Sequence, residues 1–133
     1  MKVILRNTTL VFETKPFTPI ILDETAFIVG SFIRPTGIES ANNYFGCTDY
    51  INFQGAKSIQ AGAIWGALNI AGAAFYDADK NFIGSIYGIS GMNNSHATAY
   101  DIPFSSIPAN AIYVRFSSRI ESDPAYQPFV NIS

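Results

Sequence analysis

The sequence has few charged residues. Lysine, arginine, aspartate and glutamate together make up 14% of the 133 residues, against roughly 25% in an average domain. Surface helices need such residues on their solvent-exposed side, so the shortage favours a sheet protein over a helical one. The eight basic residues are scattered and the formal net charge is −2. DNA and RNA are therefore poor partners, because nucleic-acid binding normally requires a basic stripe.

Cysteine and histidine are nearly absent. Cys47 stands alone, so no internal disulfide can form, and it is interpreted as a small buried apolar residue. His96 is also single, which excludes a metal site rich in histidine. The ten carboxylates are dispersed, and nothing indicates a pair held about 5 to 9.5 Å apart as glycosidases require. We expect no enzymatic activity, no cofactor and no metal.

The sequence also lacks recognisable membrane and export signals. Residues 1–13 contain Lys2 but no long apolar core and no small-residue cleavage site, so we expect no signal peptide. Residues 58–76 carry no charge and are long enough for a membrane helix. However, Gln60 and Asn69 interrupt this stretch, and each of its three glycines weakens a helix by about 1 kcal/mol relative to alanine. We therefore expect no membrane insertion.

What the sequence does contain is a series of short β-prone segments separated by turns. They span residues 3–12, 26–34, 48–53, 69–76, 82–87, 111–116 and 129–132. No window of a dozen residues shows a sustained apolar period of 3.6 residues. About eight strands, each with one apolar side to bury, predict an all-β, two-sheet antiparallel sandwich or jelly roll. We expect a single domain over residues 1–133, with a jelly-roll core at 21–133 and an N-terminal strand or arm at 1–20.

Alternation within two segments separates a core side from a solvent side. In residues 111–116, Ile112, Val114 and Phe116 fall on one side of the strand and Tyr113 and Arg115 on the other. In residues 48–53, Ile51 and Phe53 share one side, and Tyr50 and Asn52 share the opposite one. The apolar sides are predicted to form the core.

Residues 77–81 are predicted to be the turn of a hairpin between two apolar strands. The pattern Asp77-x-Asp79-x-Asn81 also matches the start of a calcium-binding loop. However, Phe82 stands where that loop requires glycine, and Gly88 stands where it requires a chelating glutamate. We therefore interpret the segment as a plain turn.

Three segments together resemble a known family. Residues 73–83 read AAFYDADKNFI, residues 107–116 read IPANAIYVRF, and residues 48–53 read TDYINF. In this order and spacing they are similar to a β-sandwich module of phage tail, baseplate and fibre proteins, over about residues 26–132. The resemblance implies a jelly-roll fold akin to carbohydrate-binding modules and a place on a virion or in the extracellular space. It also implies host surface glycans and other virion proteins as partners, but it carries over no ligand site.

Candidate ligand-binding residues come from aromatic and amide side chains in predicted loops. Trp65 lies in a glycine-rich stretch and could offer a ring on which a sugar stacks, although a single tryptophan in a small β domain is more often in the core or at a subunit interface. Tyr44 with Asn43, and Asn94 with His96, could fix the sugar hydroxyls. We predict that these five residues form a binding site at one end of the sandwich.

Two functions remain open at this point. One is a carbohydrate-binding, host-attachment module, and the other is a purely structural virion component whose surfaces serve assembly. The high apolar content with few charges favours a homo-oligomer. Residues 3–12, which precede Pro16 and Pro19, are hypothesised to pair as a strand across a subunit contact, with the ordinary first strand of a monomer as the alternative.

Overall fold

The computed structural model describes residues 3–6, 9–12, 16–62, 70–86, 100–120 and 127–133, the first two segments by their backbone only. Its elements there are twelve short strands and two single-turn 3-10 helices. They are β1 (Val3–Arg6), β2 (Thr9–Phe12), β3 (Ile20–Leu22), η1 (Glu24–Ala26), β4 (Ile28–Ile33), β5 (Glu39–Cys47), β6 (Ile51–Asn52), β7 (Ile59–Gly62), β8 (Ala73–Tyr76), β9 (Phe82–Ile86), β10 (Tyr100–Asp101), η2 (Phe104–Ser106), β11 (Tyr113–Arg119) and β12 (Phe129–Ile132). No helix among the described residues is long and apolar enough to cross a membrane.

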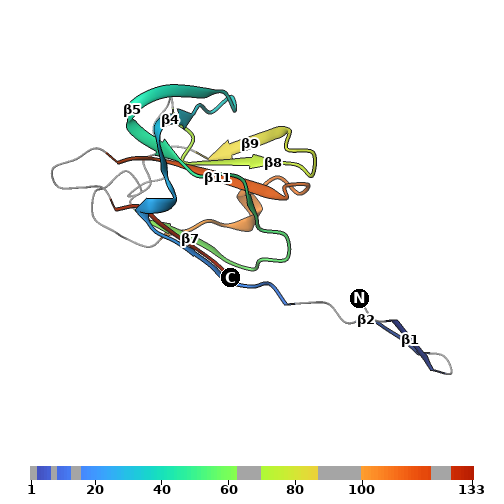
Figure 1. Ribbon diagram of the computed structural model, residues 1–133. Helices are drawn as coiled ribbons and strands as arrows, with labels where there is room; N and C mark the ends of the chain where they lie inside the picture. The colour runs from blue at the N-terminus through green and yellow to red at the C-terminus, as the bar shows by residue number, and fades with distance from the viewer. Residues whose placement is uncertain (1–2, 7–8, 13–15, 63–69, 87–99, 121–126) are drawn as a thin grey trace.

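Two antiparallel sheets stack as a sandwich (Figure 1). The four-stranded sheet has the order β10-β7-β12-β3. The six-stranded sheet has the order β4-β5-β11-β8-β9, and β6 pairs with β11 beside this path. The expected all-β, two-sheet antiparallel sandwich is confirmed.

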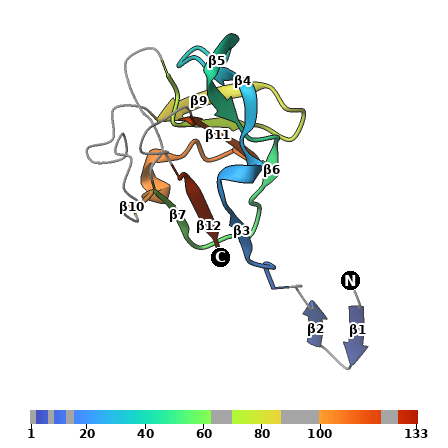
Figure 2. The same ribbon diagram turned by 60° about the vertical axis from the view of Figure 1, so that its left-hand side comes forward.

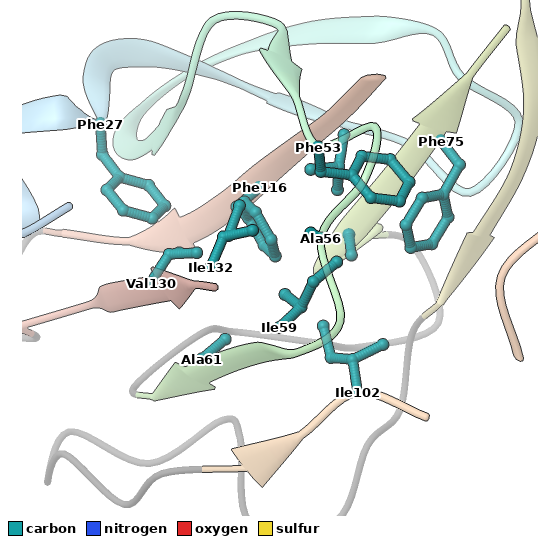
Figure 3. Packing of buried hydrophobic residues seen from close by; sticks show 12 residues of the cluster. Phe27, Phe53, Ala56, Ile59, Ala61, Phe75, Ile102, Phe116, Val130 and Ile132 are labelled. Carbon is teal, nitrogen blue, oxygen red and sulfur yellow. The ribbon is translucent and has the colours of Figure 1, made fainter. Parts of the chain in front are cut away.

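The core fills the space between the sheets. Val114 and Phe116 of β11 face inward together with Phe75 of β8, and all three are completely buried. Ile59, Val130 and Ile132 of the four-stranded sheet meet them from the opposite layer (Figure 3). The period-two alternation predicted for residues 111–116 thus separates core from surface, because successive residues of a strand point to opposite sides of the sheet.

The β8–β9 hairpin forms as predicted, with its turn at residues 77–81. The Asp77 carboxylate accepts hydrogen bonds from the backbone N–H groups of Asp79 and Asn81, both at 2.9 Å. Those hydrogen bonds hold the pKa of Asp77 below its ordinary value, with the Asn81 contact contributing most. Lys80 adopts a left-handed backbone conformation, with φ at 63°.

The sequence predicted fewer strands than the structure contains. Strands β3, β5, β7 and β10 were not predicted, and about eight strands were expected where the described residues contain twelve. Three of the missed strands have only two to four residues, too few for alternation to be visible. Strand β5 is polar along Asn42 and Asn43, and its pairing with β4 shifts register between Val29 and Gly30, which hides its period.

The N-terminal segment was expected to be one strand over residues 3–12, and that prediction is wrong. β1 and β2 pair antiparallel with each other, with Val3 opposite Phe12 and Leu5 opposite Leu10. The resulting hairpin belongs to neither sheet of the sandwich and lies away from it in both views (Figures 1 and 2). The sandwich itself begins at β3, which pairs with β12 near the C-terminus.

Candidate functional site

A row of four side chains crosses the outer side of the six-stranded sheet, opposite the core. The registers place Phe82 of β9 beside Tyr76 of β8, Tyr76 beside Tyr113 of β11, and Tyr113 beside Asn52 of β6. Neighbouring strands lie about 4.8 Å apart, so three spacings make the row about 14 Å long. We call these four residues the aromatic row.

Tyr50 stands at the middle of the aromatic row. Its ring centroid lies 4.9 Å from that of Tyr76 and 6.2 Å from that of Tyr113, both in edge-to-face geometry. Tyr76 in turn meets Phe82 edge to face at 6.0 Å. Edge-to-face packing joins the positive rim of one ring to the negative face of another. The rings therefore hold one another in place, with Tyr76 buried and Tyr50 and Tyr113 partly exposed.

Two cations lie over these rings. The Lys80 ammonium lies 5.0 Å from the Tyr50 centroid and 5.3 Å from the Tyr113 centroid. The Arg115 guanidinium lies 4.9 Å from the Tyr50 centroid. Such cation–π contacts contribute roughly 0.5–1 kcal/mol at exposed sites. Lys80 is exposed, and its left-handed backbone conformation positions it at the top of the β8–β9 turn.

Arg115 is fixed by three further contacts. Its Nε donates to the carbonyl oxygen of Thr48 at 2.9 Å, and its Nη2 donates to Glu39 Oε1 at 2.9 Å and to the sulfur of Cys47 at 3.4 Å. Burial by itself would lower the pKa of Arg115, but the neighbouring Cys47 and Glu39 outweigh burial and raise it. Arg115 is therefore a fixed positive charge at this surface.

A connection that we call the strap, residues 33–39, covers one side of the site. The Ser117 hydroxyl accepts from the Ile33 N–H at 2.9 Å, and the Ser85 hydroxyl donates to the Pro35 carbonyl at 3.0 Å. Gly37 lies directly against the ring of Phe82, leaving no space for a Cβ. The strap thus covers one side of the Phe82 ring, which stays partly exposed like Tyr50 and Tyr113, while Asn52 is exposed.

The chemistry available here suits binding better than bond cleavage. Tyrosine hydroxyls and the Asn52 amide can donate and accept hydrogen bonds beside aromatic carbon, and the Lys80 ammonium can donate them. The nearby thiol of Cys47 is a weak nucleophile, because the residue is only 3% exposed and burial raises its pKa. Within the described residues, no three metal-ligating side chains come together.

The structure describes two of the five ligand residues predicted from sequence. Tyr44 is 56% exposed and Asn43 is its exposed neighbour, both in the irregular part of β5. The Ile120 N–H donates to the Tyr44 carbonyl, so Tyr44 lies beside Ile120. Ile120 is seven residues after Tyr113 in the chain, a separation of about 20 Å at the rise of a strand. Tyr44 and the aromatic row are therefore separate surfaces. Trp65, Asn94 and His96 lie outside the described residues.

Sequence reasoning did not single out the aromatic row, although a signal for it existed. Tyr50, Asn52, Tyr113 and Arg115 all occupied the predicted solvent side of their segments. Solvent-side aromatic residues mark a binding surface only where they form a contiguous patch. What alternation could not show is that β6 and β11 are paired, which brings the two segments together.

A second surface feature is a groove of about 930 Å³ at the foot of the N-terminal segment. It is lined by Pro16, Phe17, Thr18, Pro19, Ile20, Asn52, Gln54, Gly55, Lys57 and Ser133. Asn52 therefore borders both this groove and the aromatic row.

No protein-family model matches the chain, and neither a curated protein nor a solved structure is significantly similar to it. Of the resemblance predicted for residues 26–132, the structure bears out the two-sheet antiparallel β-sandwich, and no comparison supports a phage family.

Proposed function

We propose that this protein is a non-catalytic glycan-binding module that serves attachment to a host surface from a virion or the extracellular space. The observation that carries the proposal is the partly exposed surface formed by Tyr50 and the Tyr113 end of the aromatic row, with its two cations. Tyr50 and Tyr113 present aromatic carbon to solvent, with Lys80 beside them and Asn52 at the end of the row. The location is proposed from the sequence resemblance of residues 73–83 and 107–116 alone.

The physical basis is the two-sided character of a sugar ring. Its C–H groups pack against aromatic carbon, and its hydroxyls require donors and acceptors close by. An ammonium offers three donors, an amide offers two donors and an acceptor, and a phenol hydroxyl can both donate and accept a hydrogen bond. The solvent-facing part runs from Tyr113 to Asn52 over one strand spacing, about 4.8 Å, which suits contact with a single sugar unit. The interlocked rings reduce the entropy lost when the ligand binds.

A purely structural role in a particle is the second candidate, favoured by the β1–β2 hairpin outside the sandwich. A hairpin that belongs to neither sheet has strand edges available to another subunit. The two roles are compatible, because attachment proteins also assemble.

The test is a glycan array with the purified protein, followed by calorimetry on the best ligand. Tyr113→Ala and Lys80→Ala are expected to weaken binding at least tenfold, while Tyr44→Ala, about 20 Å away, leaves it unchanged. Circular dichroism confirms that each variant is folded. Loss of binding in Tyr44→Ala alone would move the site to β5, and an array with no signal above background would overturn the proposal.

A further inference from the structure

The β1–β2 hairpin cannot be stable by its own contacts. Each strand has four residues, and an isolated two-stranded hairpin is at best marginally stable in water. Its register places Val3, Leu5, Leu10 and Phe12 at positions of one face, all of them apolar residue types. A hairpin of this composition needs an additional sheet on which to rest.

The hairpin and the sandwich differ in charge. Residues 1–15 hold three basic residues, Lys2, Arg6 and Lys15, and one acidic residue, Glu13, which gives +2. Subtracting these from the eight basic and ten acidic residues of the chain leaves five and nine, so residues 16–133 carry −4. The N-terminal segment is therefore complementary in charge to the body of a copy of this same protein.

One edge of the sandwich matches the hairpin in both apolar character and charge. β3 is the last strand of the four-stranded sheet, and no described strand pairs with its other edge. Ile21 of β3 is 79% exposed, and the exposed acidic residues Asp23 and Glu24 follow it directly. No basic residue occurs between residues 16 and 33. An uncovered strand edge with an exposed isoleucine invites pairing with another strand.

The path of the chain favours a second copy over the protein's own edge. The hairpin is joined to β3 through Pro16 and Pro19, each of which has a fixed φ and no N–H donor. Phe17 between them packs against the core, which anchors the segment. Residues 16–19 point away from the sandwich, and the hairpin lies apart from β3 in both views (Figures 1 and 2). Pairing with its own β3 would require the chain to reverse between Phe12 and Ile20, a short link that contains both prolines.

We infer that the β1–β2 hairpin of one copy docks along the β3 edge of a second copy and extends its four-stranded sheet. The hairpin then rests on a larger sheet, as its stability requires. The docking brings the N-terminal segment, with its net positive charge, to the strand edge that precedes the acidic Asp23 and Glu24 of the neighbouring copy. Exchange between two copies closes a dimer, and head-to-tail exchange closes a ring, through the same contact. This inference does not depend on glycan binding.

The test measures the mass of the full-length protein by sedimentation velocity over a range of concentrations. The protein is expected to be an oligomer. Leu5→Asp in the hairpin and Ile21→Asp at the edge are each expected to raise the dissociation constant at least tenfold. Ile38→Asp is the control, since Ile38 is also exposed, at 62%, but lies on the strap. Ile21 and Ile38 lie outside the core, so their variants are expected to fold like the wild-type protein. Circular dichroism and the melting temperature verify that all three variants are folded.

Mixing the two variants separates docking on the edge from other contacts. Leu5→Asp retains an intact edge and Ile21→Asp an intact hairpin, so an equimolar mixture is expected to associate more tightly than either variant alone. A monomeric wild-type protein at all concentrations would overturn the inference. Dissociation by Leu5→Asp but not by Ile21→Asp would also overturn it and point to contacts between hairpins.

Discussion

The guanidinium of Arg115 on β11 joins the carboxylate of Glu39 at the end of the strap, with Nη2 and Oε1 2.9 Å apart. The same guanidinium donates through Nε to the carbonyl oxygen of Thr48, a residue that is 2% exposed. One side chain thus connects the strap, the sheet and the chain before β6. The contact with Thr48 is buried and the one with Glu39 is half exposed, so their loss should lower the free energy of unfolding by different amounts.

Arg115→Met is expected to lower the free energy of unfolding by about 1–3 kcal/mol, because it leaves a buried carbonyl without a donor. Glu39→Gln is expected to cost no more than about 1 kcal/mol, since the Glu39 side chain is half exposed and solvent screens the ion pair. Urea denaturation of both variants measures the difference. Equal losses would show that the ion pair, and not the Thr48 contact, is the main contribution of Arg115.

Gly37→Ala is expected to be much more destabilising than Gly55→Ala. Both glycines have positive φ, 87° and 88°, so each alanine costs about 1–2 kcal/mol in backbone strain. At Gly55 the added methyl group meets open space, whereas at Gly37 it collides with the ring of Phe82. The collision should add about 1–3 kcal/mol. Thermal unfolding of the two variants isolates this added loss, and similar melting temperatures would contradict the contact between strap and Phe82.

The Cys47 thiol is expected to resist labelling in the folded protein. Burial raises its pKa, so less thiolate forms at pH 8 to 9 than in a free cysteine, and the residue is almost inaccessible. A chromogenic disulfide reagent should react within minutes in denaturant but far more slowly without it. The pH dependence of the slow reaction should be shifted to higher pH than that of N-acetylcysteine. Rapid labelling of the native protein at pH 8 would contradict this arrangement.

Trp65→Ala tests the site predicted from sequence. If Trp65 stacks on a sugar, glycan affinity should fall by about 1–3 kcal/mol with the fold intact. If it lies in the core, the free energy of unfolding should fall by about 3–5 kcal/mol instead. If it lies between subunits, the molecular mass should change. Calorimetry, denaturation and sedimentation on this one variant distinguish the three positions, and unchanged binding removes Trp65 from the glycan site.

The sequence was sufficient for the local features of the fold. Alternation in residues 111–116 placed Val114 and Phe116 in the core, because side chains of a strand necessarily alternate between its two sides. The turn at residues 77–81 was predictable from five small or polar residues between two apolar runs. The shortage of charge and the absence of a helical period gave the all-β class.

Only the tertiary structure decided which segments meet. Tyr50, Lys80 and Arg115 are far apart in the sequence, and the pairing of β6 and β8 with β11 brings them together. The pairing of β1 with β2, which makes residues 3–12 a hairpin, was equally out of reach. Periodicity records the side on which a residue lies, but it contains no information about which strand is its neighbour. That choice depends on long-range register, which is fixed only when the two sheets close around their common core.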